Sequence, residues 1–208
     1  LIDLLYLRKS FVDDAVEQLA LQKEISRLYE EEVGNAQSAF ENYRIALALS
    51  PEDEDVLTSL LILSDNLGNF EELFLILDEE ASEMDESPQQ VQMWRIQATM
   101  ARDKMEDNTT AIDYFSRVMA RDEEDVETIT ALASLYRDAE QWEPLVGVLE
   151  RNAELVEEID EKKMLFLEMG SIYFGSLENP EQAIVAYEEI LSLDPNDITA
   201  LNSLDNLY

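Results

Sequence analysis

The stretch FLEMGSIYFGSLENPEQAIVAYEEILSLDP, residues 166–195, decides the fold. Its aromatic, small and apolar residues recur three and four positions apart, a spacing that places them on one side of a helix. The Asn179-Pro180 pair inside it is typical of the start of a second helix. The stretch therefore predicts two helices joined by a turn, with apolar sides that other helices must cover.

The same pattern recurs when the sequence is compared with itself at an offset of 72 residues. The matching positions hold small, aromatic, apolar and acidic residues: Ala39, Ala111 and Ala183; Tyr43, Phe115 and Tyr187; Ala46, Val118 and Ile190; Asp53, Asp125 and Asp197. A second set consists of leucines, namely Leu1, Leu73 and Leu145 with Leu5, Leu77 and Leu149. Within a block, Ala39-x3-Tyr43 and Leu73-x3-Leu77 mark equivalent helix sides 34 residues apart. A fixed period of this length indicates a repeat array.

The pattern resembles the tetratricopeptide repeat, whose signature is an aromatic residue, a Leu-Gly pair, a Tyr, an Ala-x3-Phe and a Pro. The best copy comprises Phe166, Met169, Gly170, Tyr173, Ala183, Tyr187 and Pro195. Weaker copies comprise Trp94, Gln97, Ala98, Ala111 and Phe115, then Ile129, Leu132, Ala133, Tyr136, Leu145 and Leu149, and a partial one Leu201, Leu204, Asp205 and Tyr208. The sequence departs from this signature in two ways. Leu61 and Asp205 stand where the signature has a small residue, and the units that contain Leu73 and Leu145 lack its Ala and Pro.

The resemblance implies an all-α fold, an α-solenoid of antiparallel helix–turn–helix repeats with about twelve helices. The expected segments are a second helix at 1–17, repeats at 18–53, 54–90, 91–125, 126–162 and 163–197, and a first helix at 198–208. Because both ends fall inside a repeat, we expect a piece of a longer array whose ends are covered by further repeats or another subunit. The main alternative is another kind of superhelix built from amphipathic helical hairpins. A coiled coil is disfavoured because residues typical of turns interrupt the apolar pattern.

Residues that begin and end helices agree with this frame. All five prolines, Pro51, Pro88, Pro144, Pro180 and Pro195, fall at predicted helix starts, where the missing N–H costs nothing. Ser50, Ser87, Asn179 and Asp194 precede four of them and are the predicted N-caps. Gly34, Gly68 and Gly175 mark predicted helix ends.

The charge is extreme, since 48 acidic residues face 14 basic ones and give a net charge of −34. Nucleic acid and anionic membrane surfaces are disfavoured as ligands because both require a basic surface. The acidic outer surface favours basic partners. A solvated acidic surface that keeps an array soluble, or that suits a salty environment, is the simpler explanation of the charge. No apolar run approaches the roughly 18 residues of a membrane span, so no membrane insertion is expected, and the absence of a signal segment slightly favours the cytoplasm.

Signals for chemistry are weak. The sequence holds no Cys and no His, which removes the usual nucleophiles, bases and zinc ligands. The acidic runs at 53–55 and 122–125 lack the spaced ligands and Gly of a calcium loop and suit the first turns of helices. We therefore expect no catalytic residue, no metal and no cofactor.

One distribution indicates a binding surface. In the resembled family the first helix of each pair lines a concave face, which here corresponds to five positions in each of five repeats, beginning at Ala20, Asp55, Gln92, Glu127 and Met164. Basic residues occupy five of these 25 positions and only nine of the other 183, an enrichment of about fourfold. The candidate groove residues are Lys23, Arg27, Arg95, Thr99, Arg102, Thr130, Ser134 and Arg137.

These cations permit two interpretations. They could grip the carboxylates of an extended peptide, or they could neutralise acids inside the groove, as the neighbouring pairs Arg102–Asp103 and Arg137–Asp138 suggest. The sequence thus predicts a non-catalytic protein–protein interaction scaffold for a protein or peptide partner. The alternative is a structural subunit or spacer of a large assembly, packed end to end through apolar stripes such as Leu1, Leu4 and Leu5.

Overall fold

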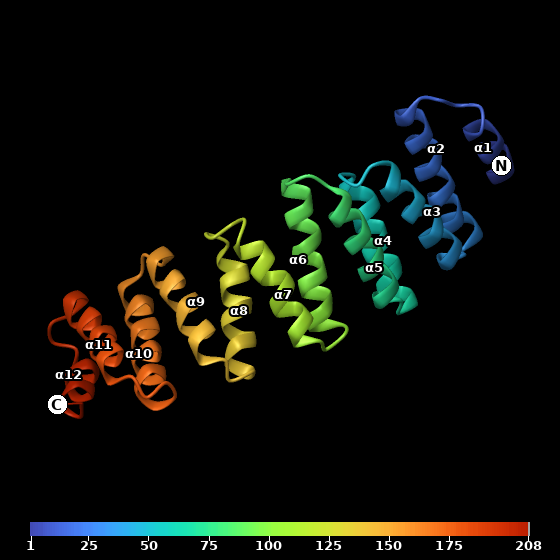
Figure 1. Cartoon of the computed structure of the whole chain (residues 1–208). Helices are drawn as coiled ribbons and strands as arrows, with labels where there is room; N and C mark the ends of the chain where they lie inside the picture. The colour runs from blue at the N-terminus through green and yellow to red at the C-terminus, as the bar shows by residue number, and fades with distance from the viewer. Residues whose placement is uncertain (208) are drawn as a thin grey trace. The chain divides into compact units, whose positions relative to one another are not determined.

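The computed structural model describes residues 1–207, so the predicted motif position at Tyr208 lies outside the described residues. This part of the chain contains twelve α-helices, one π-helical turn and no strand. The helices form two compact units, Leu1–Asp107 and the residues from Asn108 onward, which we describe separately (Figure 1). The predicted all-α class is confirmed, whereas the predicted repeat boundaries stay a prediction.

The first unit, unit 1, consists of consecutive helices that pack each on the next. Its elements are α1 (Ile2–Lys9), α2 (Ala15–Leu28), the π-helical turn η1 (Tyr29–Val33), α3 (Ala36–Leu49), α4 (Glu54–Leu67), α5 (Phe70–Glu83) and α6 (Pro88–Asp103). The apolar residues of the predicted repeat are its core, since Ala39, Leu73 and Leu77 are fully buried. Leu60 and Phe40 fill the space between the hairpins.

The second unit, unit 2, has the same arrangement. It comprises α7 (Asn108–Met119), α8 (Val126–Asp138), α9 (Trp142–Leu155), α10 (Ile159–Gly175), α11 (Pro180–Leu193) and α12 (Ile198–Asp205). The repeat positions Ala111, Leu145 and Ala183 are again fully buried. We call the even-numbered helices from α2 to α12 first helices, because each opens a predicted repeat, and the odd-numbered ones second helices.

Helices α10 and α11 approach each other closely where Gly170 faces the ring of Tyr187. A Cβ atom on Gly170 would lie 2.5 Å from Cε1 and 2.6 Å from Cζ of Tyr187. A Cβ atom does not fit in this space, so the repeat motif requires glycine at this position. Its partner is the large residue of the same motif, so one small and one large residue together set the distance between the two helices.

Replacing Gly170 by Ala tests this contact. Although alanine favours a helix by about 1 kcal/mol, the overpacking against Tyr187 costs about 1–3 kcal/mol, so we expect a net loss of up to about 2 kcal/mol in the free energy of unfolding. The matched control is Gly147→Ala in α9, where no atom lies within 4 Å of the added Cβ and stability should stay or rise. Urea unfolding measures both. A Gly170→Ala protein as stable as the Gly147→Ala protein would contradict the packing.

The helix starts partly correct the sequence prediction. Pro88 and Pro180 are first-turn residues with Ser87 and Asn179 as N-caps, as predicted. Ser50 and Asp194, in contrast, end the preceding helices α3 and α11, and the N-caps of α4 and α12 are Asp53 and Asp197. The predicted N-caps Ser50 and Asp194 were therefore wrong. Likewise, Pro51 and Pro195 lie in the turns before α4 and α12, not in the helices.

These turns explain the error. The N–H of Asp53 donates to Ser50 O at 3.1 Å, and the N–H of Asp197 donates to Asp194 O at 3.0 Å. Pro51 and Pro195 occupy the second position of these four-residue turns, which proline favours because its φ is fixed. The Ser-Pro and Asp-Pro signals thus mark a turn that precedes the cap by three residues.

The turns that follow the first helices need a left-handed residue. Gly34 and Gly68 supply it after η1 and α4, as the sequence predicted for helix ends. Gly175 also ends a helix, yet the left-handed residue of that turn is Glu178, and Glu106 and Glu140 take this conformation in the equivalent turns. Positive φ at a residue with a Cβ is unfavourable, so the fold imposes these turns on glutamates that would not choose them alone.

Candidate functional site

The candidate groove residues all lie on first helices, but they divide between the two units. Lys23 and Arg27 lie on α2, and Arg95, Thr99 and Arg102 on α6, all in unit 1. Thr130, Ser134 and Arg137 lie on α8 in unit 2. The structure therefore presents two first-helix faces, one in each unit.

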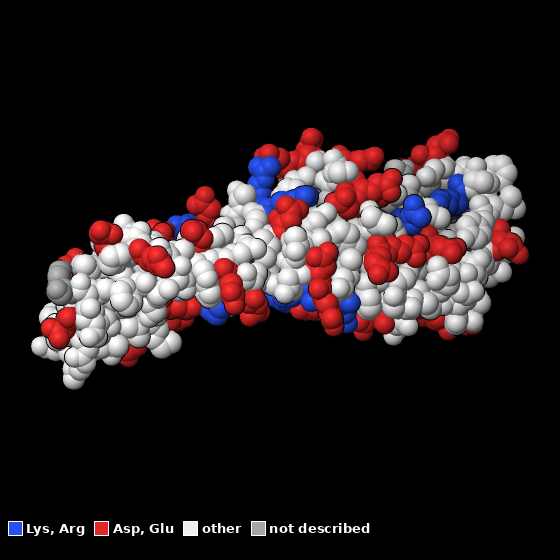
Figure 2. Space-filling model, turned by 60° about the horizontal axis from the view of Figure 1, so that its bottom comes forward, with Lys and Arg blue, Asp and Glu red and all other residues white. Residues whose placement is uncertain are grey.

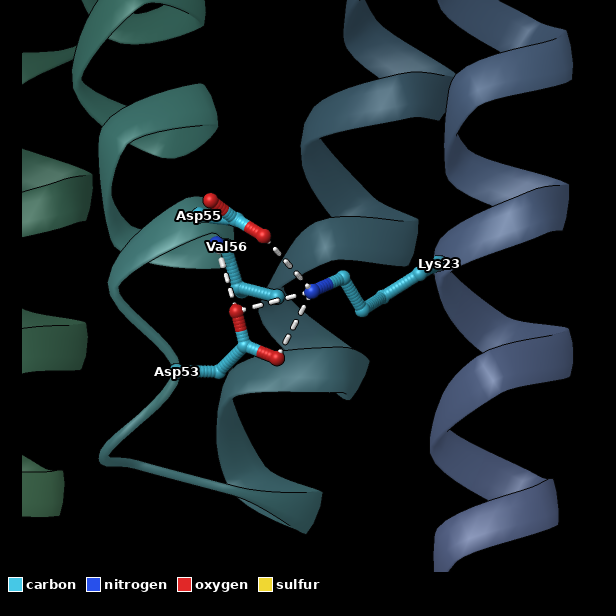
Figure 3. Close-up of polar contacts among 4 residues, drawn as sticks. All are labelled: Lys23, Asp53, Asp55 and Val56. Carbon is cyan, nitrogen blue, oxygen red and sulfur yellow. Dashed lines mark hydrogen bonds and ion pairs between the residues drawn. The ribbon is translucent and has the colours of Figure 1, made fainter.

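In unit 1, Lys23 joins two neighbouring first helices through Asp53 (Figure 3). Its Nζ lies 2.9 and 2.8 Å from the carboxylate oxygens of Asp53 and 3.3 Å from Oδ2 of Asp55. Asp53 Oδ1 also accepts the N–H of Val56 at 3.1 Å and so caps α4. One carboxylate therefore begins α4 and at the same time ties that helix to α2.

The surroundings fix the charge of this pair. Burial alone would raise the pKa of Asp53, yet hydrogen bonds from Lys23 and from the Val56 N–H hold that pKa below its ordinary value. Burial likewise opposes the charged form of Lys23, and hydrogen bonds to Asp53 and Asp55 overcome it and raise the pKa. The two side chains are only 24% and 15% exposed, so this contact is better shielded from solvent than a surface ion pair.

The same device recurs in unit 2. Asp197, two 72-residue periods after Asp53, caps α12 by accepting the N–H groups of Thr199 and Ala200, both at 3.0 Å. Lys163 of α10 contacts it at 2.6 Å and Asp194 at 3.0 Å. These contacts raise the pKa of Lys163 to about 12, and they hold the pKa values of both carboxylates below their ordinary range.

The other candidate cations have carboxylate neighbours too. Arg102 contacts the adjacent Asp103 at 2.6 Å, as the sequence suggested. Arg137 contacts Glu168 of α10 at 2.7 Å, and not the adjacent Asp138 that the sequence suggested. Arg27 lines a shallow, open depression of about 430 Å³ between α2 and α4, together with Lys23 and acids such as Glu30 and Glu31.

The polar candidates are plain surface residues. Thr99 is half-buried on α6, and Ser134 is exposed on α8. Thr130 is exposed and donates its hydroxyl to Val126 O at 2.7 Å within the same helix. None of these three side chains is held by a neighbouring helix in the contacts described.

Sequence reasoning missed the partners that lie one repeat further along. Lys23 and Asp53 are 30 residues apart, while Arg137 and Glu168, like Lys163 and Asp194, are 31 apart. Such spacings join a first helix to the start or body of the next first helix. A search for opposite charges roughly one repeat apart would have found all three pairs.

Neither a metal centre nor a membrane span emerges from residues 1–207. No group of three or more His, Cys, Asp or Glu side chains in this range is arranged to hold a metal ion. No helix in the same range is both long and apolar enough to cross a membrane.

Replacing Lys163 by Met tests the clamp between α10 and α12 through its pH dependence. Asp194 and Asp197 have lowered pKa values, so their stabilisation is present above about pH 4 and is lost as pH falls through the folded-state pKa values. The raised pKa of Lys163 adds stabilisation that is complete below about pH 10 and lost as pH rises through about 12.

We therefore expect Lys163→Met to lower the urea midpoint most between about pH 4 and 10, and the difference from the wild type to shrink near pH 2–3. Lys162→Met is the control for loss of one positive charge at the neighbouring position. If Lys163→Met lowers the urea midpoint by the same amount at pH 3 and pH 7, the methylene groups of Lys163, and not its ion pairs, supply the stability.

Comparisons with known proteins agree with the geometry. Residues 165–197, which contain most of α10 and all of α11, match the family model described as tetratricopeptide repeat. A search of curated proteins finds no match to the sequence. Among solved structures, a tetratricopeptide repeat protein from Parabacteroides merdae has a TM-score of 0.52 at 14% identity, covering 91% of this chain and 72% of that one.

Two further structures are similar to the same degree. The C-terminal part of a TPR repeat-containing protein from Cytophaga hutchinsonii gives a TM-score of 0.51 at 14% identity, covering 89% of this chain and 73% of that one. The MamA protein gives 0.50 at 14% identity, covering 85% and 92%. The chain thus has the fold of tetratricopeptide repeat proteins, and the predicted recognition of this repeat is confirmed. Folds of this class present extended surfaces that generally serve protein interaction.

Proposed function

We propose that this chain is a non-catalytic protein–protein interaction scaffold that binds a protein or peptide partner through its first-helix faces. The observation that carries the proposal is the form of these faces. The depression between α2 and α4 is open and lined by charged and hydroxyl side chains, among them Thr58 and Ser59. Small-molecule sites are enclosed and mostly apolar, whereas an open polar surface suits an extended macromolecular partner.

The charge of both units favours a basic partner. Unit 1 has 25 acidic and 8 basic residues, and unit 2 has 23 and 6. Figure 2 shows acidic side chains spread over one face, with basic side chains next to them. Because Lys23, Arg102 and Arg137 already contact carboxylates, an acidic peptide would have to displace these contacts, while a basic one would meet the surplus acids.

Charge reversal separates the two kinds of partner. The full chain carrying Arg102→Glu and Arg137→Glu is used to capture proteins from a lysate of the source cells at low and at moderate salt. We expect a basic partner that is retained by this variant and lost at moderate salt. The matched control carries Arg117→Glu and Arg151→Glu, the same charge change on the second helices α7 and α9.

Each other outcome has a definite meaning. Loss of the partner from the first variant but not from the control would show that the faces bind carboxylates. Capture of nothing by the wild-type chain in either salt would contradict the interaction scaffold itself.

A second candidate function is a structural subunit packed end to end. The observation that favours it is the exposure of Leu1, Leu4 and Leu7 on and beside α1, and of Ile198 and Leu201 on α12. If these surfaces stack, the sedimentation coefficient of the chain should rise with concentration, and Leu4→Glu with Leu201→Glu should abolish the rise because it places a charge in each contact. A monomer that persists at high concentration would exclude this function.

A further inference from the structure

The first-helix face of α10 differs in chemistry from the faces of the helices before it. At the five face positions, α2 and the following turn η1 have Ala20, Lys23, Arg27, Glu30 and Glu31, and α8 has Glu127, Thr130, Ser134, Arg137 and Asp138. The corresponding residues of α10 are Met164, Leu167, Ser171, Phe174 and Gly175. A mostly charged row is therefore replaced by a mostly apolar one.

Two of these apolar side chains are open to solvent. Met164 is 67% exposed and Phe174 is 53% exposed, whereas Leu167 is half-buried against the core of unit 2. The opposite side of the same helix already supplies that core through Met169 and Ile172, which are buried. A helix that is apolar on two sides and open on one of them has more apolar surface than its own fold uses.

Ion pairs link α10, which carries this row, to the neighbouring first helix α8 and to the start of α12. Arg137 on α8 contacts Glu168 of α10, and Lys163 of α10 contacts Asp197 at the start of α12. The neighbouring face residues are hydroxyl or amide side chains, namely Thr130 and Ser134 on α8 and Thr199 and Asn202 on α12. We call Met164, Leu167 and Phe174 the α10 strip, an apolar strip with a polar border on each side.

The spacing of the strip limits what can cover it. Met164 and Phe174 are ten residues apart on one helix, a separation of about 15 Å at a rise of about 1.5 Å per residue. An extended chain advances about 3.3 Å per residue and its side chains alternate between two faces, so two side chains about four positions apart, on one face and about 13 Å apart, would reach both residues. Between these two anchors, a partner would pass Leu167 and the hydroxyl of Ser171.

The charges around the strip indicate which charge a partner should carry. Glu161 lies one turn before Met164 on α10, and Asp138 ends α8; both are exposed. Arg137 and Lys163 beside the strip are already engaged with carboxylates. The border of the strip therefore offers negative charge to a partner and little positive charge.

We propose that the α10 strip docks an extended basic segment of a protein partner, whose two apolar side chains cover Met164 and Phe174 while its lysines or arginines face the surrounding acids. This inference rests on the proposed scaffold function and names the partner class for one of its faces. Methionine suits such a site because its flexible side chain adapts to different apolar groups.

Fluorescence anisotropy with defined peptides tests the proposal on the full chain. The probe is a labelled lysine-rich peptide of about twelve residues with two leucines about four positions apart, on the same face of the extended peptide. Matched probes replace either the leucines by serines or the lysines by glutamates. We expect the first probe to bind, and each replacement to weaken binding by at least about tenfold, because each removes one of the two contributions.

The variant Met164→Ser with Phe174→Ser should weaken binding of the first probe by about tenfold or more. The control variant is Leu75→Ser with Val185→Ser, which removes two apolar side chains of similar exposure from the second helices α5 and α11. Because all four residues are exposed, circular dichroism and urea midpoints of both variants should match the wild type. The control should bind the probe as the wild type does.

The other outcomes overturn the inference in distinguishable ways. Equal binding by both variants would place the peptide elsewhere, and no binding by the wild type would remove the site; in either case lysate capture reports separately on the scaffold function. Equal binding of the glutamate probe would exclude a basic partner. A concentration-dependent increase in size that the Met164→Ser, Phe174→Ser variant abolishes would identify a second copy of this chain as the occupant.

Discussion

The arrangement of the first helices depends on an aspartate that serves two helices at once. Asp53 accepts the backbone N–H of Val56 and a hydrogen bond from Lys23, and Asp197 does the same for Ala200 and Lys163. The capping hydrogen bond is stronger when the carboxylate is ionised, and it fixes the direction of the carboxylate; the ion pair with the lysine benefits from both. The start of one helix is thus fixed by the body of the preceding first helix, and this sets which side chains share a face.

This dependence explains how far the sequence could predict the fold. The all-helical fold could be predicted from residues such as Ala39 and Leu73, because burial demands residues of a similar kind at equivalent places in successive copies. Helix starts were predicted less well, because Ser50 and Asp194 are good capping residues by type and stand beside prolines. Only the turn geometry shows that Asp53 and Asp197, three residues further on, receive the backbone N–H groups.

The left-handed glutamates show a similar limit. A glycine signals such a turn in the sequence, as at Gly34 and Gly68, but Glu106, Glu140 and Glu178 carry no local signal. Their conformation is imposed by the hairpins on either side, which must be joined by the same turn wherever they occur. Only the alignment of the repeats could have predicted these turns. Glu106 and Glu178 lie one and two 72-residue periods after Gly34, and Glu140 lies one period after Gly68.

The sequence could place the candidate residues on first helices, but it could not identify all the carboxylates that they contact. Three of the five basic residues counted in the enrichment contact carboxylates: Lys23 and Arg137 about one repeat away, and Arg102 at the adjacent Asp103. The enrichment therefore has a structural explanation. A count of cations cannot separate a ligand site from an internal neutralising network, since both place charges at the same positions.

Apolar face residues are the more informative signal in this chain. In a strongly acidic array, nearby cations reduce the repulsion between carboxylates. An arginine on the first-helix face that contacts a carboxylate therefore already has a structural role. Met164 and Phe174 have no comparable structural role within the described part of unit 2. They lie outside its core, and their exposure to water costs free energy. The docking proposal therefore rests on the exposed apolar residues of the α10 strip, and not on the residues with the strongest charge.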